Sequence, residues 1–307
     1  MQQFDAIADY QDLCGEGPLW NKDEQALYWT DIARRRFYRY IWSDRRSEIV
    51  SESMQLSSYA FNQPGGFVVT NLTGIWLWDG KSEPTLLADQ IDGHKCIMND
   101  GIADPEGRVY SGSYVRDEQG EFVKGMGCLF RVDTDGSVHI VDEGFQLSNG
   151  LGFSPDLRTL YFVDSAMHRI YAYDWQRADG SLRNRRILLQ VPVSDGIPDG
   201  LTVDAEGFIW CAHWFGGCVI RYDPDGKIER RLKVPAFQSS SVTFGGPDFL
   251  DVFVTSAAKT DSLSLAPPGY DPASGYVGGP VYHLKTNIQG REEYPAKISK
   301  PGKSPNS

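Results

Sequence analysis

Four polar residues, each with a glycine within two positions, could supply oxygen ligands to a metal ion. They are Glu16 in CGEGPLW, Asn99 in MNDG, Asn149 in SNGLGF and Asp199 in PDGLTV. Carboxylate and amide oxygens are the ligands that a hard divalent cation such as Ca²⁺ prefers. The absence of His and Cys from these positions argues against a closed zinc site. One divalent cation is therefore expected, with Ca²⁺ ahead of Zn²⁺, Mn²⁺ and Mg²⁺.

Each of these positions also has a simpler explanation. Asn-Gly and Asp-Gly are common in hairpin turns, and the Pro-Asp-Gly string around Asp199 reads as ordinary turn chemistry. A shared site needs an architecture that brings together positions about 50 residues apart, such as 99, 149 and 199. The spacing alone leaves both interpretations open.

Short β-rich runs provide such an architecture, because they recur along the chain between Gly, Pro, Asn and Asp. Six runs are clear, with starts about 40 to 50 residues apart: 26–32, 66–72, 108–114, 159–165, 208–214 and 251–257. This period predicts an all-β, six-bladed β-propeller with a central metal channel, in preference to an irregular pair of β-sandwiches. Residues just before the strands would then meet at one mouth of the channel. The segment 278–286 would close the ring by pairing with N-terminal strands.

Composition limits the class of protein. The 307 residues carry a formal net charge of -11, which argues against nucleic acid or an anionic membrane surface as a partner. We expect neither a signal peptide nor a membrane span. Five scattered cysteines without a CxxC pair favour a reducing compartment, so a cytoplasmic location is expected. We expect one propeller domain over 1–290, a disordered polar tail over 291–307, and a monomer or small homo-oligomer.

Five ordered strings resemble signature segments of the senescence marker protein/gluconolactonase/luciferin-regenerating enzyme family: CGEGPLW, MNDGIADPEGR, SNGLGFSPD, PDGLTVDAEGFIW and FGGPD. The resemblance covers about residues 13–285. It implies a six-bladed propeller with one divalent metal in the channel and hydrolysis of sugar lactones. It further implies that Glu16, Asn149 and Asp199 are metal ligands. Asn99 is implied to contact the substrate or a water held by the metal, and the neighbouring Asp100 joins it in the substrate-binding set.

One position departs from that family. Its sugar lactonases often carry Arg-Pro-Asn-Asp or Arg-Phe-Asn-Asp where this chain reads IMND at 97–100, and the arginine binds substrate hydroxyls. Ile97 cannot donate those hydrogen bonds. Either His94, Lys95 or Arg116 supplies them, or the substrate has fewer hydroxyl groups than an aldonolactone. Ile97 is therefore a substrate-binding position that bears on specificity.

The candidate ligands, together with the activity that the resemblance implies, predict a metal-dependent lactonase acting on a small-molecule substrate. The metal would polarise the lactone carbonyl while water attacks it. Asp199 is the expected general base, or the residue that orients the water if the metal acidifies it. Two alternatives remain: a non-catalytic propeller that binds Ca²⁺ or a protein partner, and a hydrolase of other esters or phosphotriesters. The polar segment 113–127 is a candidate lid, and His213 is better explained as structural than as part of the site.

Overall fold

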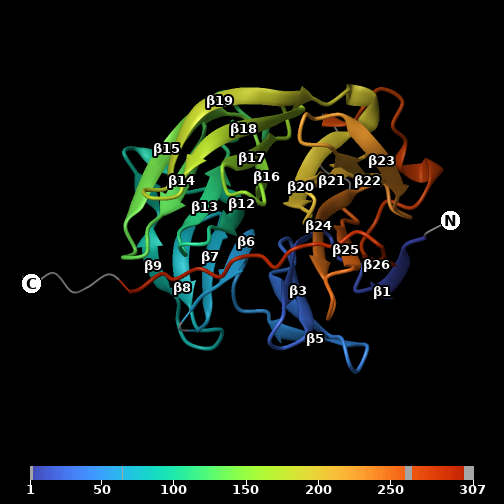
Figure 1. Ribbon diagram of the computed structural model, residues 1–307, viewed down its shortest axis with the longest axis horizontal. Coiled ribbons are helices and arrows are strands. Elements are labelled where there is room, and N and C mark those ends of the chain that lie inside the picture. The colour runs from blue at the N-terminus through green and yellow to red at the C-terminus, as the bar shows by residue number, and fades with distance from the viewer. Residues whose placement is uncertain (1–2, 64, 260–264, 301–307) are drawn as a thin grey trace, which may run out of the picture.

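The computed structural model describes residues 3–63, 65–259 and 265–300, which form six four-stranded antiparallel sheets around a central axis (Figure 1). The predicted all-β, six-bladed propeller is confirmed. Among the described residues, no helix is long and apolar enough to cross a membrane. All five cysteines are buried and unpaired.

The blades follow one another along the chain. The first blade contains β2 (Gly15–Asn21), β3 (Ala26–Asp31), β4 (Arg36–Ile41) and β5 (Arg46–Ser51). The second contains β6 (Ser58–Phe61), β7 (Phe67–Asn71), β8 (Gly74–Trp78) and β9 (Thr85–Ala88), and the third contains β12 (Met98–Ala103), β13 (Val109–Ser113), β14 (Gly127–Val132) and β15 (Val138–Phe145). The fourth contains β16 (Ser148–Phe153), β17 (Thr159–Asp164), β18 (Arg169–Gln176) and β19 (Ser181–Gln190), and the fifth contains β20 (Ile197–Val203), β21 (Ile209–Trp214), β22 (Cys218–Tyr222) and β23 (Ile228–Lys233). Outside the blades lie the hairpin of β10 (Gln90–Ile91) and β11 (His94–Lys95) and the short 3₁₀ helices η1 (Val193–Asp195) and η3 (Pro272–Ser274).

The sixth blade combines the two ends of the chain. It consists of β24 (Ser239–Gly245), β25 (Asp251–Ser256), β26 (Val281–Lys285) and the N-terminal β1 (Asp5–Ala8). Strand β1 pairs antiparallel with β26, with Asp5 opposite His283. The expectation that 278–286 closes the ring is thus confirmed, and closure removes a sheet edge that would otherwise stay unpaired.

The six recurrent runs of the sequence are the second strands of the blades, not the first. Each second strand lies between two others of its sheet and between neighbouring sheets, so β21, for example, is buried at every position. Continuous apolar runs are typical of such strands. The first strands line the channel and carry Gly, Asn and Ser, which hides them from a search for apolar runs. The polar candidates therefore lie within the first strands rather than ahead of a strand.

Large side chains fill the space between blades. Trp20 of the first blade stacks on Phe253 of the sixth with ring centroids 5.7 Å apart. Tyr110 of the third blade meets Phe153 of the fourth edge-on at 6.0 Å. Aromatic burial of this kind is the main apolar contribution to propeller packing, and it holds the first strands in fixed positions around the axis.

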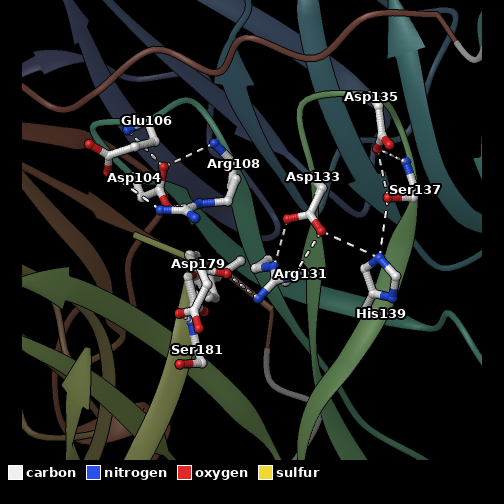
Figure 2. A network of polar contacts seen from close by, with 12 residues as sticks. Asp104, Glu106, Arg108, Arg131, Asp133, Asp135, Ser137, His139, Asp179 and Ser181 are labelled. Atoms are coloured by element: carbon white, nitrogen blue, oxygen red, sulfur yellow. Dashed lines mark hydrogen bonds and ion pairs between the residues drawn. The ribbon is translucent and has the colours of Figure 1, made fainter. Parts of the chain in front are cut away.

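A network of charged and polar residues lies at the ends of the third and fourth blades opposite to the start of their first strands (Figure 2). In the β12–β13 turn, Asp104 accepts a hydrogen bond from the backbone N–H of Arg108 and binds its Nε at 2.6 Å. At the β14–β15 turn of the same blade, Arg131 binds Asp133 through Nε at 2.7 Å and Nη2 at 2.8 Å. Arg131 also donates to the carbonyl of Asp179 in the fourth blade at 2.9 Å. These acidic residues therefore stabilise turns and connect blades.

The segment 291–300 differs from the expected disordered tail. Ala296 forms a parallel bridge with Asn62, whose side chain donates to the carbonyl of Ile298 at 3.0 Å and accepts from its N–H at 2.8 Å. Ala296 and Ile298 are buried in the core cluster of the second and third blades. The burial of Ala296 and Ile298, together with these hydrogen bonds, fixes the segment to the propeller although its overall composition is polar. Residues 301–307 lie outside the described residues.

Candidate metal centre and substrate pocket

Glu16, Asn99, Asn149 and Asp199 line a single pocket of about 250 Å³ at one end of the channel. They lie on β2, β12, β16 and β20, the first strands of four different blades. Because first strands surround the axis, residues about 50 positions apart meet in space. The structure therefore brings together the four residues that were selected as oxygen ligands.

A shared irregularity marks the strands that carry these residues. The pairing with the second strand shifts register after Glu16 in β2, after Met98 in β12, after Asn149 in β16 and after Pro198 in β20. Of the other two first strands, β24 also shifts register, between Ser239 and Ser241, whereas β6 pairs without a shift. Such bulges alter the direction of side chains relative to a regular pleat and are common beside active sites. In β2, β12, β16 and β20 each shift lies at, or one residue before, a residue of the pocket.

The glycines beside these residues serve close approach between strands rather than turns. A Cβ on Gly200 would lie 2.1 Å from Ser241 Oγ, and a Cβ on Gly150 would lie 2.5 Å from the backbone N of Leu201. Both glycines therefore lie where the first strands of adjacent blades leave no room for a side chain. The turn interpretation of Asp199 is wrong, because residues 197–203 form one strand, β20.

A chain of hydrogen bonds orients the two asparagines. Asn99 Nδ2 donates to Asn149 Oδ1 and to the Ser148 carbonyl, each at 2.8 Å. Asn149 Nδ2 donates to Ser165 Oγ at 2.8 Å, and Ser165 donates to the Pro198 carbonyl at 2.6 Å. Both amide nitrogens are thus engaged with protein. Asn149 Oδ1 keeps one lone pair, and within the described part of the chain Asn99 Oδ1 accepts no hydrogen bond, so both oxygens can still bind a ligand.

The two carboxylates lie in an environment that disfavours negative charge. Burial raises the pKa of Asp199 well above its usual value, and the charges of Glu16 and Asp100 raise it further. Burial, followed by the charge of Asp100, likewise raises the pKa of Glu16. Lys259 lowers the pKa of both carboxyl groups without reversing either shift. Clustered carboxylates of this kind are stabilised when a cation joins them.

The donor set fits a hard divalent cation. Glu16 and Asp199 supply charged oxygens, and Asn149 supplies an amide oxygen from the facing strand. Ca²⁺ binds such mixed carboxylate and amide sets with water completing its coordination. His and Cys are the usual ligands of structural zinc, and the one cysteine in this pocket wall, Cys14, has its pKa raised by burial to about 12. These residues therefore favour an oxygen-ligated ion.

Asp100 lies apart from the pocket, although it follows Asn99 directly. It lines a separate cavity of about 60 Å³ together with Tyr59 and Glu293. Burial raises the pKa of Asp100 to about 6. Because neighbouring residues of a strand point to opposite faces, Asn99 and Asp100 reach different cavities. Asp100 acts on the pocket through its charge rather than by lining it.

Ile97 is also outside the set of residues that line the pocket. Its N–H donates to the Lys95 carbonyl at 3.0 Å, and its carbonyl accepts from the N–H of Tyr114 at 3.2 Å. Of the three proposed substitutes for the missing arginine, His94 lies 3.3 Å from Cys128 Sγ in the third blade. Neither His94 nor Lys95 lines the pocket, whereas Arg116 does.

Part of the candidate lid forms a wall of the pocket. Arg116 and Phe122 pair across a short hairpin, and Val123 N–H donates to the Val115 carbonyl at 2.9 Å. Gln146 Nε2 donates to the Phe122 carbonyl at 2.9 Å and ties the hairpin to the segment before the fourth blade. The hairpin therefore has fixed attachments to the propeller.

Other pocket residues escaped the sequence reasoning. Ser57, Trp214 and Lys259 also line the pocket. The hydroxyl of Ser57 is buried and has no hydrogen-bond partner among the described residues. Ser57 precedes β6 and Lys259 follows β25 outside any repeated string, and Trp214 ends the recurrent run 208–214 without a polar group that would mark it as part of a site. His213, by contrast, is fully buried and bonded through both ring nitrogens, which agrees with the structural role expected for it.

Comparisons with known proteins agree with this geometry. Residues 14–258 match the family described as SMP-30/Gluconolactonase/LRE-like region. The chain is 34% identical over 295 residues to pentonolactonase XacC of Haloferax volcanii, covering 95% of this chain and 97% of the relative. It is 31% identical over 286 residues to 6-deoxy-6-sulfogluconolactonase of Pseudomonas putida, covering 92% and 94%. A solved structure of regucalcin, a calcium-binding protein from Agrobacterium tumefaciens, superposes with a TM-score of 0.82 at 26% identity, covering 97% and 98%. The chain therefore belongs to the SMP-30/gluconolactonase/LRE-like family.

Proposed function

We propose that the protein is a metal-dependent lactonase that hydrolyses the ring ester of a sugar lactone. The observation that carries this proposal is the pair of carboxylates, Glu16 and Asp199, which face one pocket together with two oriented amides. Two relatives are named as lactonases, and a similar structure is described as calcium-binding. These names support the same reaction class and the same kind of ion.

Glu16, Asn149 and Asp199 would hold the ion, with Ca²⁺ the first candidate. A divalent cation bound there supplies Lewis-acid polarisation of the lactone carbonyl and offsets charge on the developing oxyanion. Asn99, whose Oδ1 accepts no hydrogen bond within the described part of the chain, lies beside this set and would contact either the ion or a substrate hydroxyl.

Asp199 is the proposed base. Its carboxylate accepts a proton from the water that attacks the carbonyl carbon, and the ring C–O bond breaks as the ring oxygen takes up that proton. The product is a hydroxy acid, which is ionised at neutral pH and so releases a proton. Burial raises the proton affinity of Asp199, which suits a base, while coordination to a cation lowers it.

The pocket walls indicate how the ring would be held. Ser57, which lines the pocket and whose hydroxyl has no hydrogen-bond partner among the described residues, would contact a ring hydroxyl. The rings of Phe122 and Trp214 cover apolar faces of the substrate and limit access of bulk water. Arg116 lies on the hairpin that follows β13 and would supply the hydrogen-bond donors that Ile97 lacks.

The experiment is a proton-release assay with sugar lactones, aliphatic lactones and simple esters. The protein is first treated with a chelator and then supplied with Ca²⁺, Zn²⁺, Mn²⁺ or Mg²⁺. The proposal predicts ring opening of sugar lactones only after a metal is restored. Turnover confined to esters would replace the lactonase by another hydrolase. Metal binding without turnover of any substrate would indicate a non-catalytic, calcium-binding propeller.

A further inference from the structure

Arg116 is placed in the pocket by contacts with neutral groups. Its guanidinium carbon lies 3.9 Å from the centroid of the Phe122 ring and 5.7 Å from that of Tyr114, and one Nη donates to the Gly120 carbonyl. Stacking on an aromatic ring fixes the plane of a guanidinium while its edge can still donate hydrogen bonds. None of these partners carries a negative charge.

Arg116 belongs to a different part of the pocket wall from the candidate metal ligands. Glu16, Asn149 and Asp199 lie on the first strands β2, β16 and β20, whereas Arg116 lies on the 114–123 hairpin, where it pairs with Phe122. From this hairpin we expect Arg116 to meet a substituent of the lactone ring rather than the reacting carbonyl.

The balance of charges in the pocket indicates a role for Arg116. A divalent cation offsets the two charges of Glu16 and Asp199, so the charges of Arg116 and Lys259, which also line the pocket, are not required to stabilise them. The whole chain has a formal net charge of -11, so positive groups in its pocket differ in sign from the protein as a whole. A guanidinium matches an oxyacid group with two parallel hydrogen bonds, and it gains far less from a neutral hydroxyl.

We infer that the preferred substrate is a lactone bearing an anionic oxyacid substituent, and that Arg116 binds this substituent. The inference rests on the proposed lactonase function and names the substrate class within it. A carboxylate, a sulfonate or a phosphate would present the same chemistry to Arg116. Arg116 then takes over the substrate recognition that Ile97 cannot provide, and it binds a charged substituent of the lactone rather than its hydroxyl groups.

The test compares matched substrates on the metal-loaded protein. Glucono-1,5-lactone is assayed beside analogues that carry a carboxylate, a sulfonate or a phosphate at C6. Wild-type kcat/KM is expected to favour at least one anionic lactone over the neutral one by roughly ten- to hundredfold, the range of one hydrogen bond to a charged group. The preference should shrink between about 0.01 M and about 1 M salt, as the Debye length falls from about 30 Å to about 3 Å. Which anion ranks first identifies the substituent.

Variants separate the inference from the proposed function. Arg116→Gln should lower the anionic-to-neutral ratio of kcat/KM roughly tenfold or more, mainly through KM, and Arg116→Lys should restore part of it. Arg46→Gln, which removes the same charge from the outer strand β5 of the first blade, should leave the ratio unchanged. Turnover of both lactones with an unchanged ratio in Arg116→Gln, or a wild-type preference for the neutral lactone, overturns the inference alone. Absence of turnover on every lactone in the metal-loaded wild type overturns the proposed function and the inference with it.

Discussion

Two groups of buried acidic residues in the propeller are compensated in opposite ways. In the β12–β13 and β20–β21 turns, at the end of the blades away from the pocket, Asp104 and Asp204 are buried beside arginines: Asp104 binds Arg108 at 2.6 Å, and Asp204 binds Arg221 at 2.7 Å. At the pocket end, neither Glu16 nor Asp199 forms a salt bridge in the described part of the chain, and burial raises the pKa of both. Residue type is thus a poor guide to role. The difference lies in whether the fold itself supplies the compensating charge or leaves that to a ligand.

Replacing Asp199 by alanine should produce the largest change in activity. Loss of the base, together with a metal ligand, should lower kcat/KM by about 10³-fold or more. Proton release at saturating metal would measure the loss. Asp225→Ala, which alters an exposed acidic residue in the β22–β23 turn, provides the control and should retain wild-type turnover. Substantial activity of Asp199→Ala at saturating metal would falsify the assignment.

Replacing Asp204 by alanine should produce the largest change in stability. Asp204 accepts hydrogen bonds at 2.8 Å from Trp210 Nε1 and from Arg221 Nε, and Arg221 is only 3% exposed. Removing it leaves a buried guanidinium with less compensation, so the free energy of unfolding should fall by about 3–5 kcal/mol. Urea unfolding measures this. If the free energy of unfolding fell no more than in Asp225→Ala, the Asp204–Arg221 ion pair would not be needed to stabilise this end of the blade.

The close approach of first strands can be tested at Gly200. A Cβ there would overlap Ser241 Oγ and the Ser241 backbone. Gly200→Ala should therefore cost about 1–3 kcal/mol of stability through overpacking. Adding Ser241→Gly should recover part of the loss by removing the clashing side chain. If Gly200→Ala were neutral in thermal unfolding, the glycine would have to be explained by backbone conformation instead.

The stability of the metal-free protein should depend on pH in a direction set by Glu16 and Asp199. A carboxyl group with a raised pKa in the folded state binds more protons folded than unfolded, so the free energy of unfolding decreases as pH rises. For Glu16 the window runs from the ordinary value of 4.5 to about 8. Protons compete with the metal, so added Ca²⁺ should raise Tm by more at the upper end of this window than at the lower end. An equal Ca²⁺-induced shift in Tm across the window would argue against these ligands.

The architecture was accessible from the sequence because second strands are buried on all sides. Segments such as 26–32 and 208–214 read as apolar runs at a regular spacing, and each proved to contain a second strand. The first strands were misread, because Asn149-Gly150 and Asp199-Gly200 have the sequence of turns. Their glycines instead relieve contacts with the next blade, which no local pattern reveals.

The candidate site could be predicted only in part, because contacts between distant parts of the chain are not visible in a local sequence pattern. Repeated strings identified Glu16, Asn99, Asn149 and Asp199, and the structure places all four in one pocket. Asp100 was grouped with them by adjacency, but the alternation of a strand directs it to another cavity. Arg116 could only be offered as one of several candidates, since the path of its hairpin over the pocket depends on tertiary contacts.

Binding of a divalent ion tests most directly whether a ligand, rather than a protein side chain, compensates the charges of Glu16 and Asp199. Calorimetric titration of Ca²⁺ into chelator-treated protein should give one ion per chain, with protons released near neutral pH. Asp199→Asn should weaken this binding by roughly a hundredfold, whereas Asp225→Asn should leave it intact. If Asp199→Asn bound Ca²⁺ as tightly as the wild type, the carboxylates of the pocket would not be the ligands and the account would be wrong.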